Sequence, residues 1–180
     1  MIETERLLVR TWRARDRAEY LASCNTAAVT AQLGGPSSPE DIDAALGRIA
    51  RCQEEHGFCF WAVERKSDSA LLGYCGLKVT DLPGTPVHGD IEIGWRLRED
   101  AWGQGYAREA AEAVLAWAWA NLDCGRVVSF TIPANEPSWR LMERIGLVRK
   151  PNLDFAHPNF PSKHPLSRHI AYVAERPPRD

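Results

Sequence analysis

The sequence lacks a surplus of charge of either sign. Its 180 residues carry 22 lysines and arginines against 24 aspartates and glutamates, which gives a formal net charge of −2. A protein that binds nucleic acid needs a concentrated basic face to displace phosphate counterions. The near balance of charge therefore argues against a nucleic-acid partner.

Long apolar runs are also missing. No stretch approaches the roughly 18 apolar residues that a membrane-spanning helix requires. The first residues, Met1 to Arg6, hold no apolar segment of the kind found in a secretory signal. We therefore expect a cytoplasmic protein that has no membrane partner.

Patterns typical of metal centres and disulfide frameworks are absent. The cysteines are odd in number and none forms a Cys-x-x-Cys pair, so we expect free thiols packed as small hydrophobes. They are Cys24, Cys52, Cys59, Cys75 and Cys124. His157, His164 and His169 lie in or beside a proline-rich loop without the spacing of metal ligands on a helix. We expect no metal.

The pattern that is present fits one domain spanning residues 1–180. Runs of strand-forming residues alternate with segments whose apolar residues recur at helical spacing. We predict strands at about 7–12, 58–63, 71–79, 87–97, 126–132 and 167–174, and helices at about 16–24, 39–56, 105–120 and 135–145. This order indicates an α/β architecture around a mixed sheet, with a parallel crossover between residues 91 and 132.

Several local signals refine this prediction. Asp16 and Glu19 have the spacing of a capping box at a helix start. Gly73 and Gly76, inside a predicted strand, indicate close backbone approach or a bend. The helix after residue 105 has small residues on its apolar face, which would let it pack close to a sheet.

The most informative segment joins the strand Ile91 to Leu97 to that helix. It reads Trp102-Gly103-Gln104-Gly105-Tyr106-Ala107. Backbone N–H groups and the positive end of a helix would converge there, which makes an anion site. A pyrophosphate fits such a site, although a glycine loop that only turns the chain would have the same sequence features.

Two nucleotide-binding motifs fail at this loop. The dinucleotide pattern Gly-x-Gly-x-x-Gly matches at Gly103 and Gly105, but its third glycine falls on Arg108. The Gly-Lys-Ser/Thr of a P-loop does not follow either.

The loop, with its preceding strand and alanine-rich helix, resembles the acetyl-CoA motif of the GNAT superfamily of N-acetyltransferases. Gly105 and Ala107 match its two small positions, whereas Trp102 departs from the broad consensus. Trp-Gly-x-Gly-Tyr-Ala resembles the ribosomal-protein, RimJ/RimL-like branch. Further similar stretches are Thr4-Glu5-Arg6-Leu7, residues 72–77, Asn135-Glu136-Pro137-Ser138, Ile145-Gly146-Leu147, residues 154–158 and residues 169–172.

The resemblance implies a mixed, mostly antiparallel central sheet of about seven strands flanked by about four helices. It also implies transfer of an acetyl group from acetyl-CoA to a primary amine, by direct attack in a ternary complex. The amine could belong to a protein N-terminus or to a small molecule, and a homodimer is possible. A non-catalytic acyl-CoA-binding module of the same fold, or an unrelated nucleotide-binding protein, are the alternatives.

Roles for individual residues follow from the resemblance. The backbone of Trp95, Arg96 and Leu97 would pair with the pantetheine arm. Asn135 would bind the cofactor, and Ser138 would face the thioester sulfur. The pyrophosphate would be held by Trp102, Gly103, Gln104, Gly105, Tyr106, Ala107 and Arg108.

Two further positions bear on the chemistry. Many relatives have a tyrosine acid where this chain has Met142. Glu92, on the polar face of its strand, is the candidate general base, and a surface or cross-strand paired carboxylate is its structural alternative. Acceptor contacts would come from about residues 27–47 and 152–164.

Overall fold

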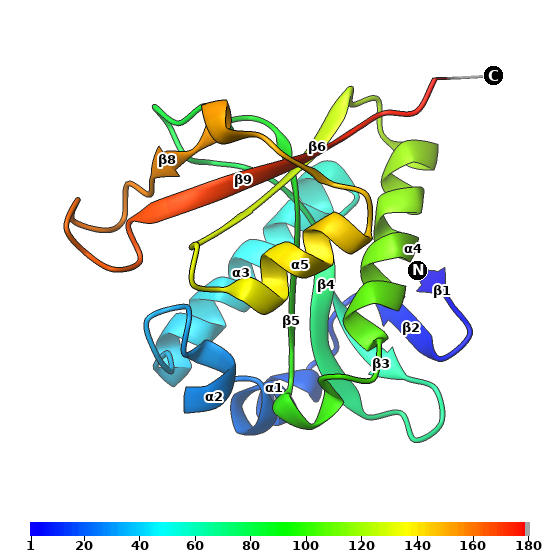
Figure 1. Ribbon diagram of the computed structural model, residues 1–180. Helices are drawn as coiled ribbons and strands as arrows, with labels where there is room; N and C mark the ends of the chain where they lie inside the picture. The colour runs from blue at the N-terminus through cyan, green and yellow to red at the C-terminus, as the bar shows by residue number, and fades with distance from the viewer. Residues whose placement is uncertain (179–180) are drawn as a thin grey trace.

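A computed structural model describes residues 1–178 and shows one mixed sheet flanked by helices (Figure 1). The described chain contains nine strands in the order β1-β2-β3-β4-β5-β6-β9-β7, with β8 also paired to β9. Every adjacent pair is antiparallel except β5 and β6. The predicted mixed, mostly antiparallel fold is therefore confirmed. The strands are β1 (Ile2–Glu3), β2 (Leu7–Arg10), β3 (Phe60–Arg65), β4 (Leu71–Val79), β5 (Ile91–Leu97), β6 (Arg126–Thr131), β7 (Val148–Arg149), β8 (Phe155–Ala156) and β9 (Arg168–Glu175).

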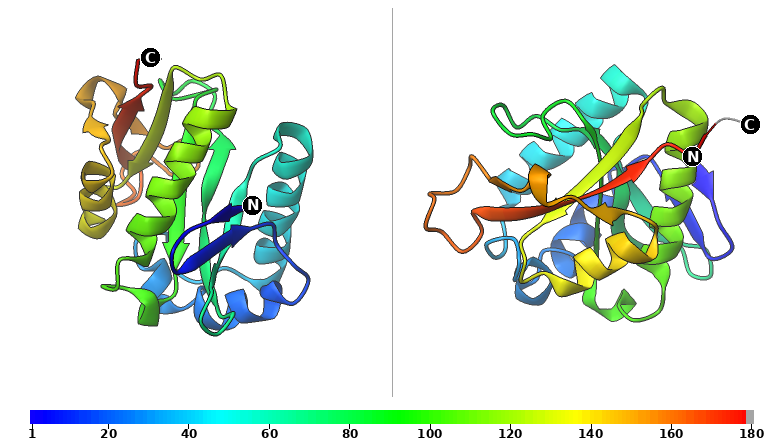
Figure 2. Two further views of the ribbon diagram at one scale, coloured as in Figure 1. Left: turned by 90° about the vertical axis from the view of Figure 1, so that its right-hand side faces the viewer. Right: turned by 45° about the horizontal axis from the view of Figure 1, so that its top comes forward.

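Helices cover both faces of the sheet, as Figure 2 shows with α4 and α3 on opposite sides of the strands. The five α-helices among residues 1–178 are α1 (Asp16–Ser23), α2 (Ala27–Thr30), α3 (Pro39–His56), α4 (Tyr106–Asn121) and α5 (Glu136–Arg144). Short 3-10 turns lie at Glu99–Ala101 and Pro151–Leu153. None of the helices in residues 1–178 is long and apolar enough to cross a membrane.

The helix α4 packs closely on the sheet through small side chains, as the sequence predicts. Ala110, Ala111, Val114 and Ala118 are fully buried in the main core. A second cluster on the opposite face joins Tyr20 of α1 and its neighbours to β3 and β4. The sheet is thus fixed from both sides, which holds β5 in place.

The parallel pair β5 and β6 separates after a short contact. The two strands pair at Ile91↔Val127 and Glu92↔Val128, near the amino-terminal end of each. No further pair joins them in the described chain, and Figure 1 shows β6 crossing away from β5. The sheet therefore opens beside the carboxyl-terminal half of β5.

Two glycines of β4 permit its close contact with both neighbours, as predicted. A Cβ added at Gly73 would lie 2.1 Å from the Arg96 carbonyl oxygen, and one at Gly76 would lie 2.1 Å from that of Cys59. Because those obstacles are backbone atoms, neither position accepts a side chain without moving a strand.

The capping box predicted at Asp16 and Glu19 is wrong. The N-cap of α1 is Arg15, and it makes no side-chain cap. The Asp16 carboxylate instead receives hydrogen bonds from Arg10, at 2.6 and 2.9 Å, and Glu19 accepts the backbone N–H of Leu71. Both carboxylates bind groups elsewhere in the fold, so neither caps the helix.

Element ends differ from the prediction where a turn replaces regular structure. Val87 is buried, but residues 83–89 form turns, so β5 begins at Ile91 and not at residue 87. The helix after residue 39 is confirmed, with Ser38 as its cap and Gly57 ending it in the left-handed conformation at φ 77°. Elements α2, β1, β7 and β8 were not predicted, because segments of two to four residues show no periodicity.

Candidate active site

The open edge of β5 presents backbone groups to the gap beside β6. Successive residues of a strand direct their N–H and C=O groups to opposite sides. The carbonyl of Arg96 points to β4, where it lies against Gly73, so the backbone groups of Trp95 and Leu97 point to the opening. The Leu97 carbonyl already accepts the indole N–H of Trp102 at 2.9 Å. Trp95 therefore offers the clearest pairing position for an extended ligand chain.

The start of α4 lies next to this opening and has unsatisfied donors. Its N-cap is Gly105, in the left-handed conformation at φ 82°, and it has no side chain that could cap the helix. The first bond inside the helix runs from the Glu109 N–H to the Gly105 carbonyl at 3.0 Å. The N–H groups of Tyr106, Ala107 and Arg108 thus have no acceptor within the helix and favour an anion.

Contacts from three directions fix the loop before the helix. Gln104 donates through Nε2 to the Asp100 carbonyl, and Arg6 donates through Nη1 to the Gln104 carbonyl. Glu109 of α4 accepts from the Thr4 hydroxyl at 2.6 Å and from Arg6. Gly103 has φ 71°, which suits glycine. The N-terminal Thr-Glu-Arg stretch therefore holds the loop and α4 together.

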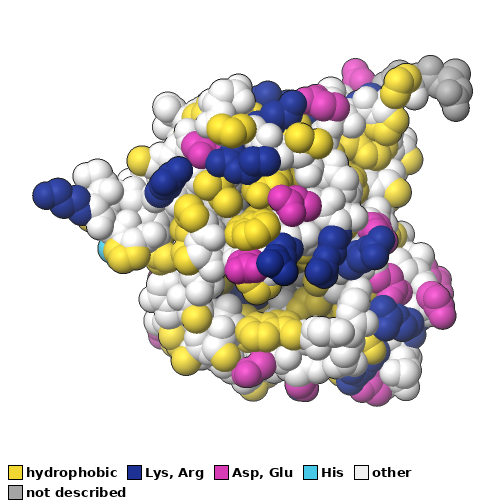
Figure 3. Space-filling view, viewed as in Figure 1, with side chains coloured by type: hydrophobic (Ala, Val, Ile, Leu, Met, Phe, Trp, Pro, Cys, Tyr) yellow, Lys and Arg dark blue, Asp and Glu magenta, His cyan; other side chains and the backbone are white. Residues whose placement is uncertain are grey.

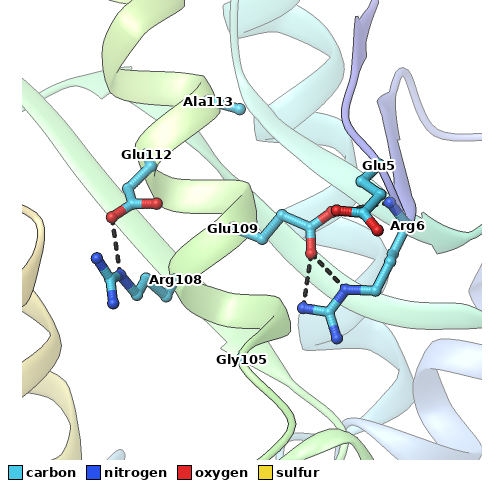
Figure 4. Close-up of a pocket in the computed structure, with 7 residues that line it drawn as sticks. All are labelled: Glu5, Arg6, Gly105, Arg108, Glu109, Glu112 and Ala113. Carbon is cyan, nitrogen blue, oxygen red and sulfur yellow. Dashed lines mark hydrogen bonds and ion pairs between the residues drawn. The ribbon is translucent and has the colours of Figure 1, made fainter.

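A shallow pocket on the outer side of the helix start does not suit a phosphate. Figure 4 shows Arg6 paired with Glu109 and Arg108 paired with Glu112, with Glu5 nearby. Each arginine already has a carboxylate partner, and three carboxylates line the pocket. An anion should instead approach the helix end from the side of the sheet opening. The side chain predicted to help hold the pyrophosphate, Arg108, is turned to Glu112.

The helix α5 borders the opening from the β6 side. Asn135 precedes it and donates through Nδ2 to the Thr131 hydroxyl at 2.9 Å. Ser138 is half-buried in its first turn, and its hydroxyl has no hydrogen-bond partner within the described chain. Met142 is buried in the core. In Figure 3 the surface is hollowed in front of β5, and basic side chains lie along the edge of the hollow below α5.

The carboxylate of Glu92 is buried, with only 11% of its side chain exposed. It lies across from Lys78 of β4, whose Nζ is 3.1 Å from Oε2, although the two atoms are not aligned for a hydrogen bond. Burial raises the pKa of Glu92, and the charge of Lys78 opposes that rise. Glu92 is therefore paired across strands with Lys78, which is the structural alternative to a general base. It is also buried, and its raised pKa makes it a stronger base.

Sequence reasoning missed the partners of Glu92 on β4. Tyr74, Gly76 and Lys78 lie opposite Arg96, Gly94 and Glu92 on one face of the sheet. Alternation within each strand gives the face of each residue, but register between strands decides which residues meet. The polar residue Lys78 inside an otherwise apolar strand was the available signal.

The histidines and aromatic residues near β8 and β9 form a packed cluster. The ring centres of His157 and His169 are 5.0 Å apart; His169 stacks on Phe155 at 5.5 Å, and His157 lies tilted to it at 6.2 Å. Burial lowers the pKa of both histidines. No group of three His, Cys, Asp or Glu side chains in residues 1–178 is placed to hold a metal ion, and the five cysteines are free.

Comparison with known protein families shows the family to which the chain belongs. Residues 6–148 match the family described as Acetyltransferase (GNAT) domain, so the chain belongs to the GNAT acetyltransferases. The uncharacterized N-acetyltransferase YnaD of Bacillus subtilis (strain 168) is 37% identical over 150 residues, which cover 83% of each chain.

Solved structures agree on the fold. An acetyltransferase from Agrobacterium tumefaciens has a TM-score of 0.78 and 25% identity, over 97% of this chain and 93% of that one. A ribosomal-protein-S5-alanine acetyltransferase from Vibrio fischeri has a TM-score of 0.73 and 17% identity, over 97% and 95% of the two chains. At that identity the second likeness shows the fold alone.

Proposed function

We propose that this protein transfers the acetyl group of acetyl-CoA to a primary amine. The observation that carries the proposal is the meeting of the open edge of β5 with the uncapped start of α4 at Gly105. A thioester with a long polar arm and a pyrophosphate matches both features. The arm can add to a strand edge, and the pyrophosphate can accept from the helix N-terminus.

The remaining residues of the site have roles in this proposal. The backbone of Trp95, with Arg96 and Leu97 beside it, would guide the arm, and the loop from Trp102 to Arg108 would hold the pyrophosphate. Asn135 would support the cofactor at the start of α5.

Proton transfer is the chemical need that the protein must meet. An ammonium has no lone pair, so the acceptor must lose a proton before it attacks. Glu92, directly or through water, would accept that proton. The hydroxyl of Ser138, which has no partner in the described chain, would donate a hydrogen bond to the leaving thiolate. The amine would attack directly, with both substrates bound.

We also propose that the protein belongs to the RimJ/RimL-like branch, acts in the cytoplasm and forms a homodimer. Its acceptor would be a protein N-terminus or a small molecule.

Release of free CoA thiol tests the proposal. The purified protein is incubated with acetyl-CoA and a panel of short peptides, polyamines and small amines, and thiol is measured against a sample without acceptor. We expect acceptor-dependent release with at least one amine and a matching acetylated product. Tight binding of acetyl-CoA with no release for any amine would favour the non-catalytic module.

A further inference from the structure

A cation without a counterion lies on the face of the sheet that carries Glu92. Arg96 donates through Nη1 to the Tyr20 hydroxyl at 3.0 Å, and its guanidinium carbon is 5.6 Å from the centre of the Tyr74 ring. Its Nε is buried and has no hydrogen-bond partner. No carboxylate of the described chain forms an ion pair with Arg96, although arginines elsewhere in the chain do find such partners.

The neighbours of Arg96 do not balance its charge. Burial raises the pKa of Tyr20, so its phenol stays neutral at physiological pH. Lys78 and Glu92, farther along the same face, pair with each other. Glu19 of α1 lies 3.4 Å from Arg98. Arg96 is half-buried, and because a charge withdrawn from water without an ionic partner is costly, this arrangement fits a site that a bound anion completes.

A flat aromatic surface connects this cation to the candidate base. Gly94 separates Arg96 from Glu92, and the ring of Phe60 lies 3.0 Å from where a Gly94 Cβ would be. Phe60 stacks on Tyr74, with ring centres 5.1 Å apart and planes within 11°. The missing side chain at Gly94 leaves room for that ring. One continuous face thus carries a cation, an aromatic floor and a carboxylate.

We propose that the acceptor amine carries an anionic group, a carboxylate or a phosphate, which Arg96 binds while the amine lies at Glu92. This inference rests on the proposed acetyl transfer. Glu92 and Arg96 are four residues apart in a strand, so their Cα atoms are separated by about 13 Å. The amine and the anion should therefore be several bonds apart, as in a short peptide with a free C-terminus. The planar guanidinium can bind either anion through two donors.

Matched acceptors test the charge requirement. Triglycine and triglycinamide carry the same α-amine and differ in the carboxylate; 6-aminohexyl phosphate and 6-aminohexanol make the same comparison for phosphate at a similar separation from the amine. We expect kcat/KM to favour the anionic member of at least one pair tenfold or more. In Arg96→Gln this ratio should fall to about one, and Arg96→Lys should retain part of it. Arg65→Gln, which removes a partly exposed arginine paired with Asp68, should leave the ratio unchanged.

A binding measurement separates this inference from the proposed function. Thermal stability is measured with CoA plus N-acetyltriglycine or its amide, which need no catalysis. Stabilisation by N-acetyltriglycine but not by its amide would support the anion site even if no amine is acetylated, provided that Arg96→Gln abolishes the effect. The anion site would be overturned if the anionic and the neutral compound of each pair behave alike in both assays. A preference for the anionic compound that survives Arg96→Gln would overturn it as well.

Discussion

At the scale of single residues, the environment of Glu92 gives it the properties of a base. The residue sits at the last paired position of β5 and β6, so it lies where the sheet opens. Burial raises the pKa of its carboxyl, which increases its affinity for a proton. The ammonium of Lys78 keeps the charged form available.

We predict that Glu92→Gln lowers turnover tenfold or more while the affinity for acetyl-CoA is unchanged. The amide keeps the shape of the side chain but cannot accept a proton. In the wild type, kcat should fall as the pH drops through the raised pKa of Glu92, and the variant should lose that limb of the profile. A pH–rate profile with the same limb in the variant would refute the role of Glu92.

The sequence was sufficient to name this residue but not its surroundings. Alternation along β5 put Glu92 and Arg96 on one face, and the resemblance pointed to the loop at Gly105. The pairing with Lys78 and the unmatched charge of Arg96 depend on strand register and on the packing of α1. Neither is encoded in local spacing.

At the scale of elements, a buried ion network joins α1 to the sheet. Arg10 of β2 contacts Asp16 of α1 and Glu64 of β3 at 2.6 and 2.7 Å, and 9% or less of each of the three side chains is exposed. Burial alone would raise the pKa of Asp16, but hydrogen bonds from Arg10 and Arg13 outweigh it and hold the pKa below its usual value.

We predict that Asp16→Asn lowers the free energy of unfolding by about 3 kcal/mol, because it leaves part of a buried cation unpaired. The contribution of Asp16 should be complete above the unfolded pKa of about 3.9 and should fade as the pH drops through the lower folded value. Chemical denaturation at several pH values measures both. Asp43→Asn, which removes the exposed partner of Arg17, is the control and should have no measurable effect. Equal stability of the two variants would contradict the prediction.

A glycine inside β4 provides a second test at this scale. Gly76→Ala should strongly destabilise the fold, because the new Cβ would lie 2.1 Å from the carbonyl oxygen of Cys59, directly before β3. Gly125→Ala is the matched control, since its Cβ would meet nothing within 4 Å. Thermal unfolding of the two variants decides the matter. Similar midpoints for both would show that β3 and β4 can separate without cost.

Most elements could be predicted from periodicity, and the exceptions have physical causes. The helices α3, α4 and α5 have long apolar stripes and clear ends, so they were found nearly to the residue. Strand β5 was predicted too long because Val87 is buried by a turn instead of a strand. The carboxylates of Asp16 and Glu19 had the spacing of a cap, but Asp16 binds Arg10 and Glu19 accepts the Leu71 N–H instead of capping the helix.

At the scale of the whole molecule, the site arises where three parts of the chain meet. Strand β5 contributes an open edge, α4 contributes uncapped donors, and α5 closes the side toward β6. The sequence predicts each part separately. The opening itself depends on how far β5 and β6 stay paired, which is a property of the complete sheet.

Thermal unfolding with acetyl-CoA, CoA, ATP and NAD in parallel tests the central claim most directly. A ligand at 100 times its dissociation constant should add about 2.7 kcal/mol, which raises Tm by roughly 5–11 °C for a chain of this size. We expect this rise with acetyl-CoA and with CoA, and none with ATP or NAD. No rise with either CoA species, or a rise with ATP or NAD instead, would contradict the assignment of the loop from Trp102 to Ala107 as an acetyl-CoA site.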